Sequence, residues 1–290
     1  MDLFLNLTAS GFVMGCLYGL LAIAFAVIYR TTGIVNFAQG EMSMLVAYLA
    51  YTFGSFVDYS LIPLFLITVV ASIFVGLVLE RLFIRPMLGQ STLATVMVTV
   101  GLAISLRSVT IIIWGVDQED FPAPMKNEII EIGSVILFSE QLAAIAIFLT
   151  VLISIWAFFK FTRTGTSMRA VAVDETAALL MGINVKHVYS ISWAISAVIS
   201  GLAGVLFAII FARTPDMWFV GLQSFPATIL GGLESPLGSG LGGIIIGVIA
   251  DLSEGYIGQG LKDIAGFIII IFVLMVRPYG LFGQRELERV

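Results

Sequence analysis

Runs of predominantly apolar residues, repeated along nearly the whole chain, are the feature that most limits how this sequence can fold. Such runs lie, for example, at 10–29, 91–114 and 188–211. About 20 apolar residues in a helix cross a bilayer core, whereas the strands of a membrane barrel alternate apolar and polar residues over about 10 positions. Because these runs are long and do not alternate, they predict an all-α polytopic membrane protein.

The composition agrees with lipid as the main environment. Hydrophobic residues make up 59% of the 290 residues, charged residues only 11%, and the mean hydropathy is +1.07. Soluble domains contain about 25% charged residues, so a soluble chain of this composition would expose a largely apolar surface. Soluble enzymes and nucleic-acid-binding proteins are therefore excluded, and we expect no nucleic acid among the partners.

Polar breaks divide the chain into eight or nine candidate membrane spans within a single domain over 1–290. The seventh candidate is short and interrupted by Pro226, Gly231 and Gly232. The two longest polar stretches between spans lie at 115–140 and 160–187. The candidate spans are 10–29, 38–57, 61–83, 91–114, 141–159, 188–211, 218–233, 241–257 and 264–276.

The positions of the basic residues predict an orientation, since Lys and Arg concentrate in short cytoplasmic loops. One of the two possible orientations places ten of the fourteen basic residues inside the cell. It puts the amino terminus and the 115–140 loop outside, and the 160–187 loop and the carboxy terminus inside. An odd number of crossings is then required, which favours nine. The ten residues are Arg30, Arg81, Arg85, Lys160, Arg163, Arg169, Lys186, Arg277, Arg285 and Arg289.

The 160–187 stretch is predicted to contain a short cytoplasmic helix from Asp174 to Met181. Asp174 is a good N-cap, strong helix formers follow it, and Gly182 suits the position just after the helix. So short a helix falls below the ~12–15 residues needed for stability alone, so it must dock on something. Ala177 and Leu180 share one face with Met181, and this face fits either a groove in a soluble partner or the chain's own membrane domain.

Asn36, Gln39 and Glu41 form the densest polar cluster beside a span, and they follow Gly33. In an aqueous loop they would be ordinary capping residues. The functional alternative is that a broken helix start lines a translocation path, since polar groups and non-helical backbone at membrane depth face a cavity or protein.

The segment 218–243, with Gly231 and Gly232, is the expected counterpart of this cluster. The first and sixth spans run in opposite directions under the predicted orientation, and each precedes a glycine-interrupted short segment. This arrangement is typical of two inverted repeats with broken helices around a central site.

Other residues have two interpretations each. Gly11, Gly15 and Gly19 form a stripe that permits close helix packing, either within this chain or with a second subunit. Arg107 lies within the fourth span and either extends outward to water or faces a pore. The single His187 has no Cys or carboxylate neighbours at ligand spacing, so no metal site is expected. No catalytic nucleophile–base set is visible.

Three motifs carry a resemblance to a known family. Thr176 to Gly182 resembles the E-A-A-x-x-x-G loop of ATP-binding-cassette importer permeases, with Thr176 in place of the Glu. Residues 33–41 are similar to the G-L-V-N-F-A-H-G-E signature of the branched-chain amino acid permeases, with Gln39 for His. Residues 229–238 are similar to the V-L-G-G-L-G-S-x-x-G stretch of that family, with Glu234 for Gly.

The resemblance implies an import permease that is not itself an enzyme. Its partners would be a homologous second permease, two cytoplasmic ATPases that bind ATP and magnesium, an external solute-binding protein and the lipid bilayer of a bacterial or archaeal cytoplasmic membrane. The sequence itself contains no G-x-x-x-x-G-K-[ST] motif, so ATP must be bound elsewhere, and no cofactor is expected in this chain. The residues that would couple the permease to an ATPase are Asp174, Glu175, Ala177, Ala178, Met181 and Gly182.

The expected cargo is leucine, isoleucine or valine, and urea or short amides are alternatives within the same importer type. An ion-coupled secondary transporter is the alternative from another class. Such proteins usually place carboxylates deep within their spans. Here Glu41, Glu80, Asp251 and Glu254 all fall near predicted span ends. A passive channel lacks a visible selectivity motif.

Overall fold

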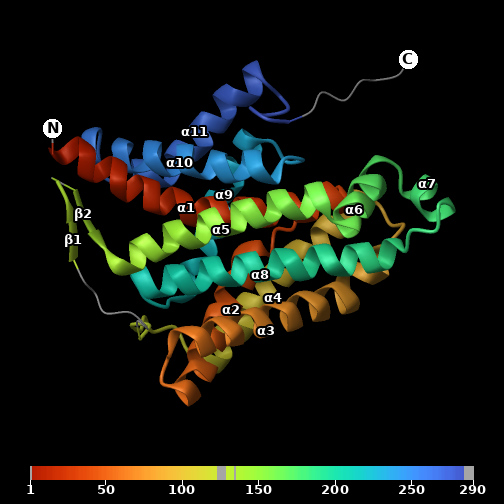
Figure 1. Ribbon diagram of the computed structural model, residues 1–290, viewed down its shortest axis with the longest axis horizontal. Coiled ribbons are helices and arrows are strands. Elements are labelled where there is room, and N and C mark those ends of the chain that lie inside the picture. Colours follow the sequence, from red (N-terminus) through yellow and green to blue (C-terminus); the bar gives the residue numbers. More distant parts are fainter. Residues whose placement is uncertain (1, 123–128, 134, 284–290) are drawn as a thin grey trace.

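The computed structural model describes residues 2–122, 129–133 and 135–283, and these residues form a bundle of α-helices with one small β-hairpin (Figure 1). The hairpin pairs β1 (Ile129–Ile132) with β2 (Val135–Phe138) in antiparallel register. The helices are α1 (Asp2–Thr32), α2 (Gln39–Gly54), α3 (Leu61–Leu79), α4 (Thr92–Trp114), α5 (Ser139–Phe161), α6 (Arg163–Val173), α7 (Glu175–Leu180), α8 (Val185–Phe211), α9 (Trp218–Gly231), α10 (Pro236–Tyr256) and α11 (Leu261–Val276).

The predicted class, a helical polytopic membrane protein, is confirmed. Within the described residues, six helices are long and apolar enough to cross a membrane: α1, α3 with its continuation to Met87, α4, α5, α8 and α10. This number is lower than the eight or nine spans expected, although a helix occupies each of the nine predicted segments. The other three, α2, α9 and α11, contain only 16, 14 and 16 residues.

The shortness of α2 and α9 has a structural reason. Each follows a long helix, α1 or α8, through a connecting segment at 33–38 or 212–217, and the second segment ends in a 3-10 turn at Pro215–Met217. The first of these segments lies deep in the bundle, where it takes the place of helical turns. The predicted spans at 38–57 and 218–233 already exclude these segments, so hydropathy located both helices but made each slightly longer than it is.

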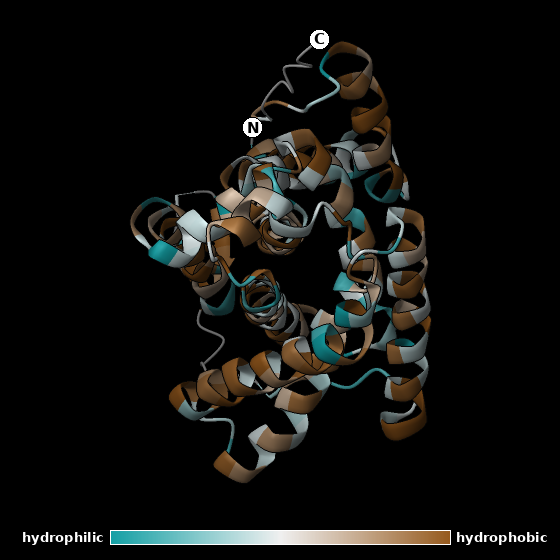
Figure 2. Ribbon diagram, turned by 90° about the vertical axis from the view of Figure 1, so that its right-hand side faces the viewer, coloured by the Kyte–Doolittle hydropathy of each residue, from teal (hydrophilic) through white to brown (hydrophobic). Residues whose placement is uncertain are grey.

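Apolar side chains cover the outside of the bundle as well as its interior. Large hydrophobic residues such as Phe74 of α3, Ile112 of α4 and Ile153 of α5 are exposed. Figure 2 shows hydrophobic residues along most helices and hydrophilic ones mainly in the turns and connecting segments. An exposed surface of this kind requires lipid around it.

Helix α1 is the central element, since its apolar window is almost entirely buried. It is enclosed by α5, α8, α9 and α10. Its glycine stripe packs on α10: a Cβ at Gly15 would lie 2.7 Å from Ile244 Cα, and one at Gly247 would lie 2.3 Å from Gly15 N. The stripe therefore serves close packing within this chain.

The two halves of the chain pack in a corresponding way. Helix α1 packs on α9 and α10, while α8 packs on α2 and α3. The two short helices cross at glycines, because a Cβ at Gly40 would lie 2.4 Å from Trp218 O and one at Gly221 would lie 2.4 Å from Gly40 Cα.

Two elements were not expected from the sequence. The hairpin β1–β2 lies in the predicted polar loop at 115–140, of which residues 123–128 and 134 are outside the described residues. Helix α6 precedes the expected short helix, although its sequence contains Gly165 and several Ser and Thr residues. It is stabilised by burial of Gly165, Met168 and Val171.

Candidate functional site

The polar cluster after Gly33 forms a non-helical break between α1 and α2. Asn36 Oδ1 accepts a hydrogen bond from Ala38 N at 3.1 Å, and Asn36 Nδ2 donates to Gln39 Oε1 at 2.9 Å. Phe37 N donates to Thr99 Oγ1 of α4 at 3.3 Å. The backbone N–H groups of Phe37 and Ala38 are thus hydrogen-bonded to side chains of a neighbouring span and of the break itself, as buried backbone requires.

Gln39 fixes the depth of this break. Its Nε2 atom donates to Ser196 Oγ of α8 at 2.9 Å and to Ser200 Oγ one helical turn further on. At a rise of roughly 1.5 Å per residue, Ser196 lies about 16 Å along α8 from Val185. Gln39 therefore contacts α8 near the middle of that spanning helix. Residues of the break at this depth are not capping residues of an aqueous loop.

Glu41 lines a cavity of about 190 Å³ next to the break. The side chain is buried, with 7% of its surface exposed. Most of the cavity wall is apolar and aromatic, and it comes from α1, the break, α2, α4 and α9. The lining residues are Phe25, Phe37, Gly40, Glu41, Val100, Ala103, Ile104, Trp218, Gly221, Leu222 and Phe225.

Trp218 lines the cavity and also contacts Arg107. The guanidinium carbon of Arg107 lies 4.5 Å from the centre of the Trp218 ring, and the same group forms an ion pair with Asp216 at 3.5 Å. Arg107 is therefore held against the start of α9. Trp218 Nε1 is buried and has no hydrogen-bond partner among the described residues.

Gly231 and Gly232 lie elsewhere. They end α9, and Gly231 O and Leu230 O accept hydrogen bonds from Phe282 N and Leu281 N. A Cβ at Gly231 would lie 2.1 Å from Gly238 O. Of the predicted path residues, the structure thus places Glu41 in the cavity wall, Asn36 and Gln39 in the hydrogen-bonded break beside it, and the two glycines in a packed turn outside the cavity.

The short helix expected at 174–181 is present as α7. Asp174 caps it, since Asp174 Oδ1 accepts from Ala177 N at 2.9 Å. Gly182 adopts φ +82°, with hydrogen bonds from Gly182 N to Leu179 O and from Ile183 N to Ala178 O, both at 3.0 Å. This is the Schellman ending that glycine permits.

Helix α7 has one face on its own chain and one face exposed. Ala178 is only 3% exposed, and Tyr189 Oη of α8 donates to Glu175 Oε2 at 3.4 Å. Leu180 and Met181 are 84% and 83% exposed. Packing on the chain's own membrane domain therefore accounts for Ala178 and leaves the opposite, apolar face free within the described residues.

Several residues that bond to the break or line the cavity were missed from the sequence. Ser196 and Ser200 stand four residues apart within an apolar span, and this spacing puts two hydroxyl groups on one helix face. That signal was available. Thr99 and Trp218 carry no such local signal, because their roles arise from contacts between distant segments.

Fold and cavity together define a class, a helical multi-pass membrane protein with a small aromatic and acidic cavity among its spans. Residues 7–276 match the family model described as "Branched-chain amino acid transport system / permease component". The chain belongs to this branched-chain amino acid transport permease family of ATP-binding-cassette transporters. The chain is therefore a permease component of an ATP-binding-cassette transporter and not itself an enzyme.

Characterised relatives support this assignment over the whole chain. The high-affinity branched-chain amino acid permease protein LivH of Salmonella typhimurium is 30% identical over 311 residues, covering 99% of this chain and 98% of LivH. BraD of Pseudomonas aeruginosa is 28% identical over 301 residues, with the same coverage. The fructose import permease protein FruG of Bifidobacterium longum is 26% identical over 238 residues, covering 75% of this chain and 66% of FruG. No solved structure matches significantly.

Proposed function

We propose that this chain is the permease subunit through which leucine, isoleucine or valine crosses the cytoplasmic membrane. The observation that carries the proposal is the similarity to LivH and BraD over almost the full length of the chain and of both relatives. FruG, named for fructose import, matches a smaller share. A branched-chain amino acid is therefore the cargo to test first.

The chemistry of the cavity supports this cargo. The Glu41 carboxylate suits an ammonium group, and the unpaired Trp218 indole N–H is a donor for a carboxylate oxygen. Phe25, Phe225 and Leu222 offer apolar surface to an aliphatic side chain. With about 30 Å³ per water molecule, a cavity of 190 Å³ has the volume of roughly six waters, which suits a small solute.

The proposed complex contains a homologous second permease, two cytoplasmic ATPases that bind ATP and magnesium, and an external solute-binding protein. Coupling would use α7 and its flanks, from Asp174 through Glu175, Ala177 and Met181 to Gly182. Ala178 would contribute indirectly, because it anchors α7 to the chain's own spans. The exposed Leu180 then joins the docking surface.

Nine crossings and two inverted repeats are the proposed membrane arrangement, within one permease domain over 1–290. Under it the amino terminus and the 115–140 loop are outside, and the 160–187 loop and carboxy terminus are cytoplasmic. The corresponding packing of α1 on α9 and α10 and of α8 on α2 and α3 supports the repeats, as does the crossing at Gly40 and Gly221.

The test uses the importer complex purified through a tag on this chain and reconstituted in liposomes with its solute-binding protein. We expect uptake of radiolabelled leucine that requires ATP on the ATPase side and is unchanged by proton or sodium ionophores. Excess isoleucine or valine should compete with leucine, whereas excess fructose or urea should not. ATP-dependent uptake of fructose or urea, without leucine uptake, would contradict the proposed cargo.

A further inference from the structure

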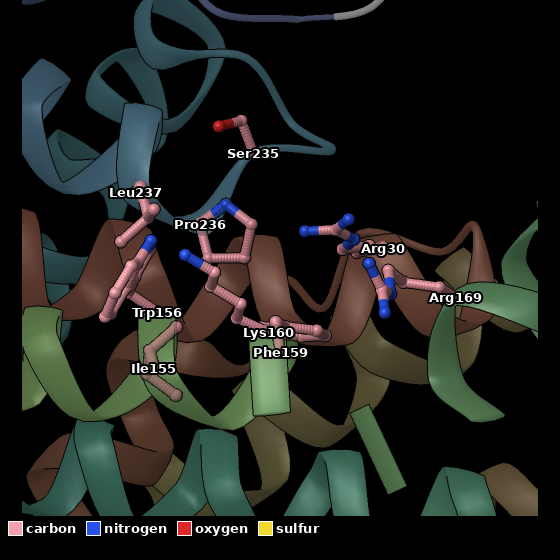
Figure 3. Close-up of a pocket in the computed structure, with 9 residues that line it drawn as sticks. All are labelled: Arg30, Ile155, Trp156, Phe159, Lys160, Arg169, Ser235, Pro236 and Leu237. Carbon is pink, nitrogen blue, oxygen red and sulfur yellow. The ribbon is translucent and has the colours of Figure 1, made fainter. Parts of the chain in front are cut away.

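A pocket of about 220 Å³ at one end of the bundle gathers three cationic side chains from three helices. Arg30 comes from the end of α1, Lys160 from the end of α5 and Arg169 from α6. Figure 3 shows the guanidinium groups of Arg30 and Arg169 next to each other, and Lys160 extending towards Pro236 at the start of α10. The pocket thus concentrates positive charge at a place separate from the Glu41 cavity.

These three cations have no ion-pair partner in the part of the chain that the structure describes. Among the described residues, no carboxylate oxygen lies within 4 Å of Arg30, Lys160 or Arg169, whereas Arg85, Arg107, Arg213 and Lys262 all form ion pairs. The adjoining larger pocket, which Arg30 and Arg169 also line, contains three carboxylates that are likewise beyond that distance, those of Asp174, Glu175 and Glu234. Like charges that share one pocket repel one another, so an anion bound among them would be stabilised.

Aromatic rings hold two of the cations in place. Lys160 Nζ lies 4.6 Å from the centre of the Trp156 ring, and the guanidinium carbon of Arg30 lies 4.7 Å from the centre of the Phe159 ring. Trp and Lys beside each other at the end of a spanning helix are typical of the membrane–water interface. The pocket therefore lies at the depth of lipid headgroups.

The pocket also continues onto surface that faces lipid. Trp156 itself is exposed, and it lies on α5, which exposes large apolar side chains along its length. A ligand that fills the pocket from the membrane would place acyl chains along α5 and its charged group among the three cations. A soluble anion would use the cations alone and leave the aromatic wall exposed to solvent.

We propose that this pocket binds the phosphate group of an anionic phospholipid, with the acyl chains lying against α5. Basic pockets between spanning helices are suited to such headgroups, because each Lys or Arg near the membrane surface adds to the attraction. The proposal depends on the protein lying in a bilayer and not on which end of the bundle faces the cytoplasm.

The test is native mass spectrometry of the full chain in neutral detergent, titrated with phosphatidylglycerol or with phosphatidylcholine. We expect saturable binding of phosphatidylglycerol that exceeds binding of phosphatidylcholine. In Lys160→Gln/Arg169→Gln, the affinity for phosphatidylglycerol should fall by about fivefold per charge, or roughly 25-fold in total. Both side chains are exposed, so the double variant keeps its core intact.

The matched control is Arg81→Gln/Lys186→Gln, which removes two exposed cations from the same end of the bundle but outside the pocket. It should bind phosphatidylglycerol as the unchanged chain does. An equal loss in the control, or equal binding of phosphatidylcholine, would overturn the proposal. Displacement of phosphatidylglycerol by equimolar glycerol phosphate would overturn the lipid as the source of the phosphate and assign the pocket to soluble phosphates.

Discussion

Gln39 and Glu41 are two residues apart, yet their environments assign them different roles. The Gln39 side chain is fully buried, and its amide is bonded to Asn36 and to two serines of α8. Its hydrogen bonds hold the break in place, as satisfied buried polar networks do. Glu41 is directed at a cavity whose other walls are apolar. A carboxylate in such surroundings is costly to maintain, which favours a functional role.

Replacing Glu41 with Gln tests that role. The substitution keeps the shape of the side chain and removes its charge, so assembly should persist while leucine uptake falls roughly tenfold or more, in line with a lost hydrogen bond to a charged group of about 1.5–3 kcal/mol. Uptake in reconstituted liposomes is the measurement. Glu131→Gln, an exposed carboxylate in the hairpin, is the control. Normal uptake by Glu41→Gln at normal abundance would remove Glu41 from the path.

At this scale the sequence predicts the acidic residue of the cavity and the polar break beside it, but not the aromatic wall. Glu41 in the wall and Asn36 in the break stand out beside an apolar span, because burying polar residues is expensive. Trp218 and Phe225 do not stand out, since aromatic residues are common in any span and only tertiary packing brings them to the cavity. Gly231 is a typical pore candidate from its sequence, but its lack of a side chain serves close packing on Gly238.

Among the elements, α7 combines in six residues a face packed on its own chain and an exposed apolar face, the proposed ATPase interface. Capping by Asp174, the ending at Gly182 and the anchor at Ala178 fix it to the bundle, while Leu180 extends away. So short a helix persists only because it is docked. Its exposed face is then already ordered, which lowers the entropic cost of binding a partner.

Leu180→Arg is the variant that separates these interfaces. Leu and Arg have similar helix propensity, and position 180 is 84% exposed, so the chain should fold and insert normally. We expect loss of ATPase subunits from the complex purified through this chain, measured by their stoichiometry on size exclusion. Thr166→Arg, which adds the same charge to α6, is the control. Retained ATPases and retained substrate-stimulated hydrolysis in Leu180→Arg would contradict docking at α7.

A substitution at Ala178 would not separate them. Its side chain is buried against the chain's own spans, so Ala178→Arg would place a charge in the anchor itself and disturb α7 whether or not a partner binds there. The sequence pairs Ala177 with Ala178 as equivalent small residues. Only the structure shows that the first is exposed and the second buried.

Whether a helix could be predicted from the sequence depends on what stabilises that helix. Long apolar helices such as α4 and α5 were predicted to within a few residues, because lipid rather than packing selects them. Helix α6 was missed, since its weak helix formers are held by burial of Met168 and Val171. The segments 38–57 and 218–233 likewise match α2 and α9 to within a few residues, but at 16 and 14 residues these helices fall short of the length that a full crossing needs.

In the molecule as a whole, a cluster of three cations marks one end of the bundle. At the other end, the start of α1 lies beside β2, where Ile136 N donates to Asn6 Oδ1, and Glu119 pairs with Arg213. Arg30, Lys160 and Arg169 share a pocket at the opposite end. Arg285 and Arg289, which also entered the predicted orientation, lie outside the described residues. This cluster lies at the end that the distribution of basic residues predicts to be cytoplasmic.

Cysteine accessibility checks this orientation. Cys16 is fully buried in α1 and is the only cysteine, so Cys16→Ala provides a background for single-cysteine variants. With a membrane-impermeant maleimide on intact cells, Asp117→Cys in the loop predicted to be external should be labelled and Thr166→Cys in α6 should be protected until the membrane is opened. Both positions are exposed to solvent, so protection of Thr166→Cys reports its side of the membrane and not its burial. Labelling of Thr166→Cys in intact cells, with Asp117→Cys protected, would invert the molecule. It would place α7 on the side without ATP, where it could not contact an ATPase.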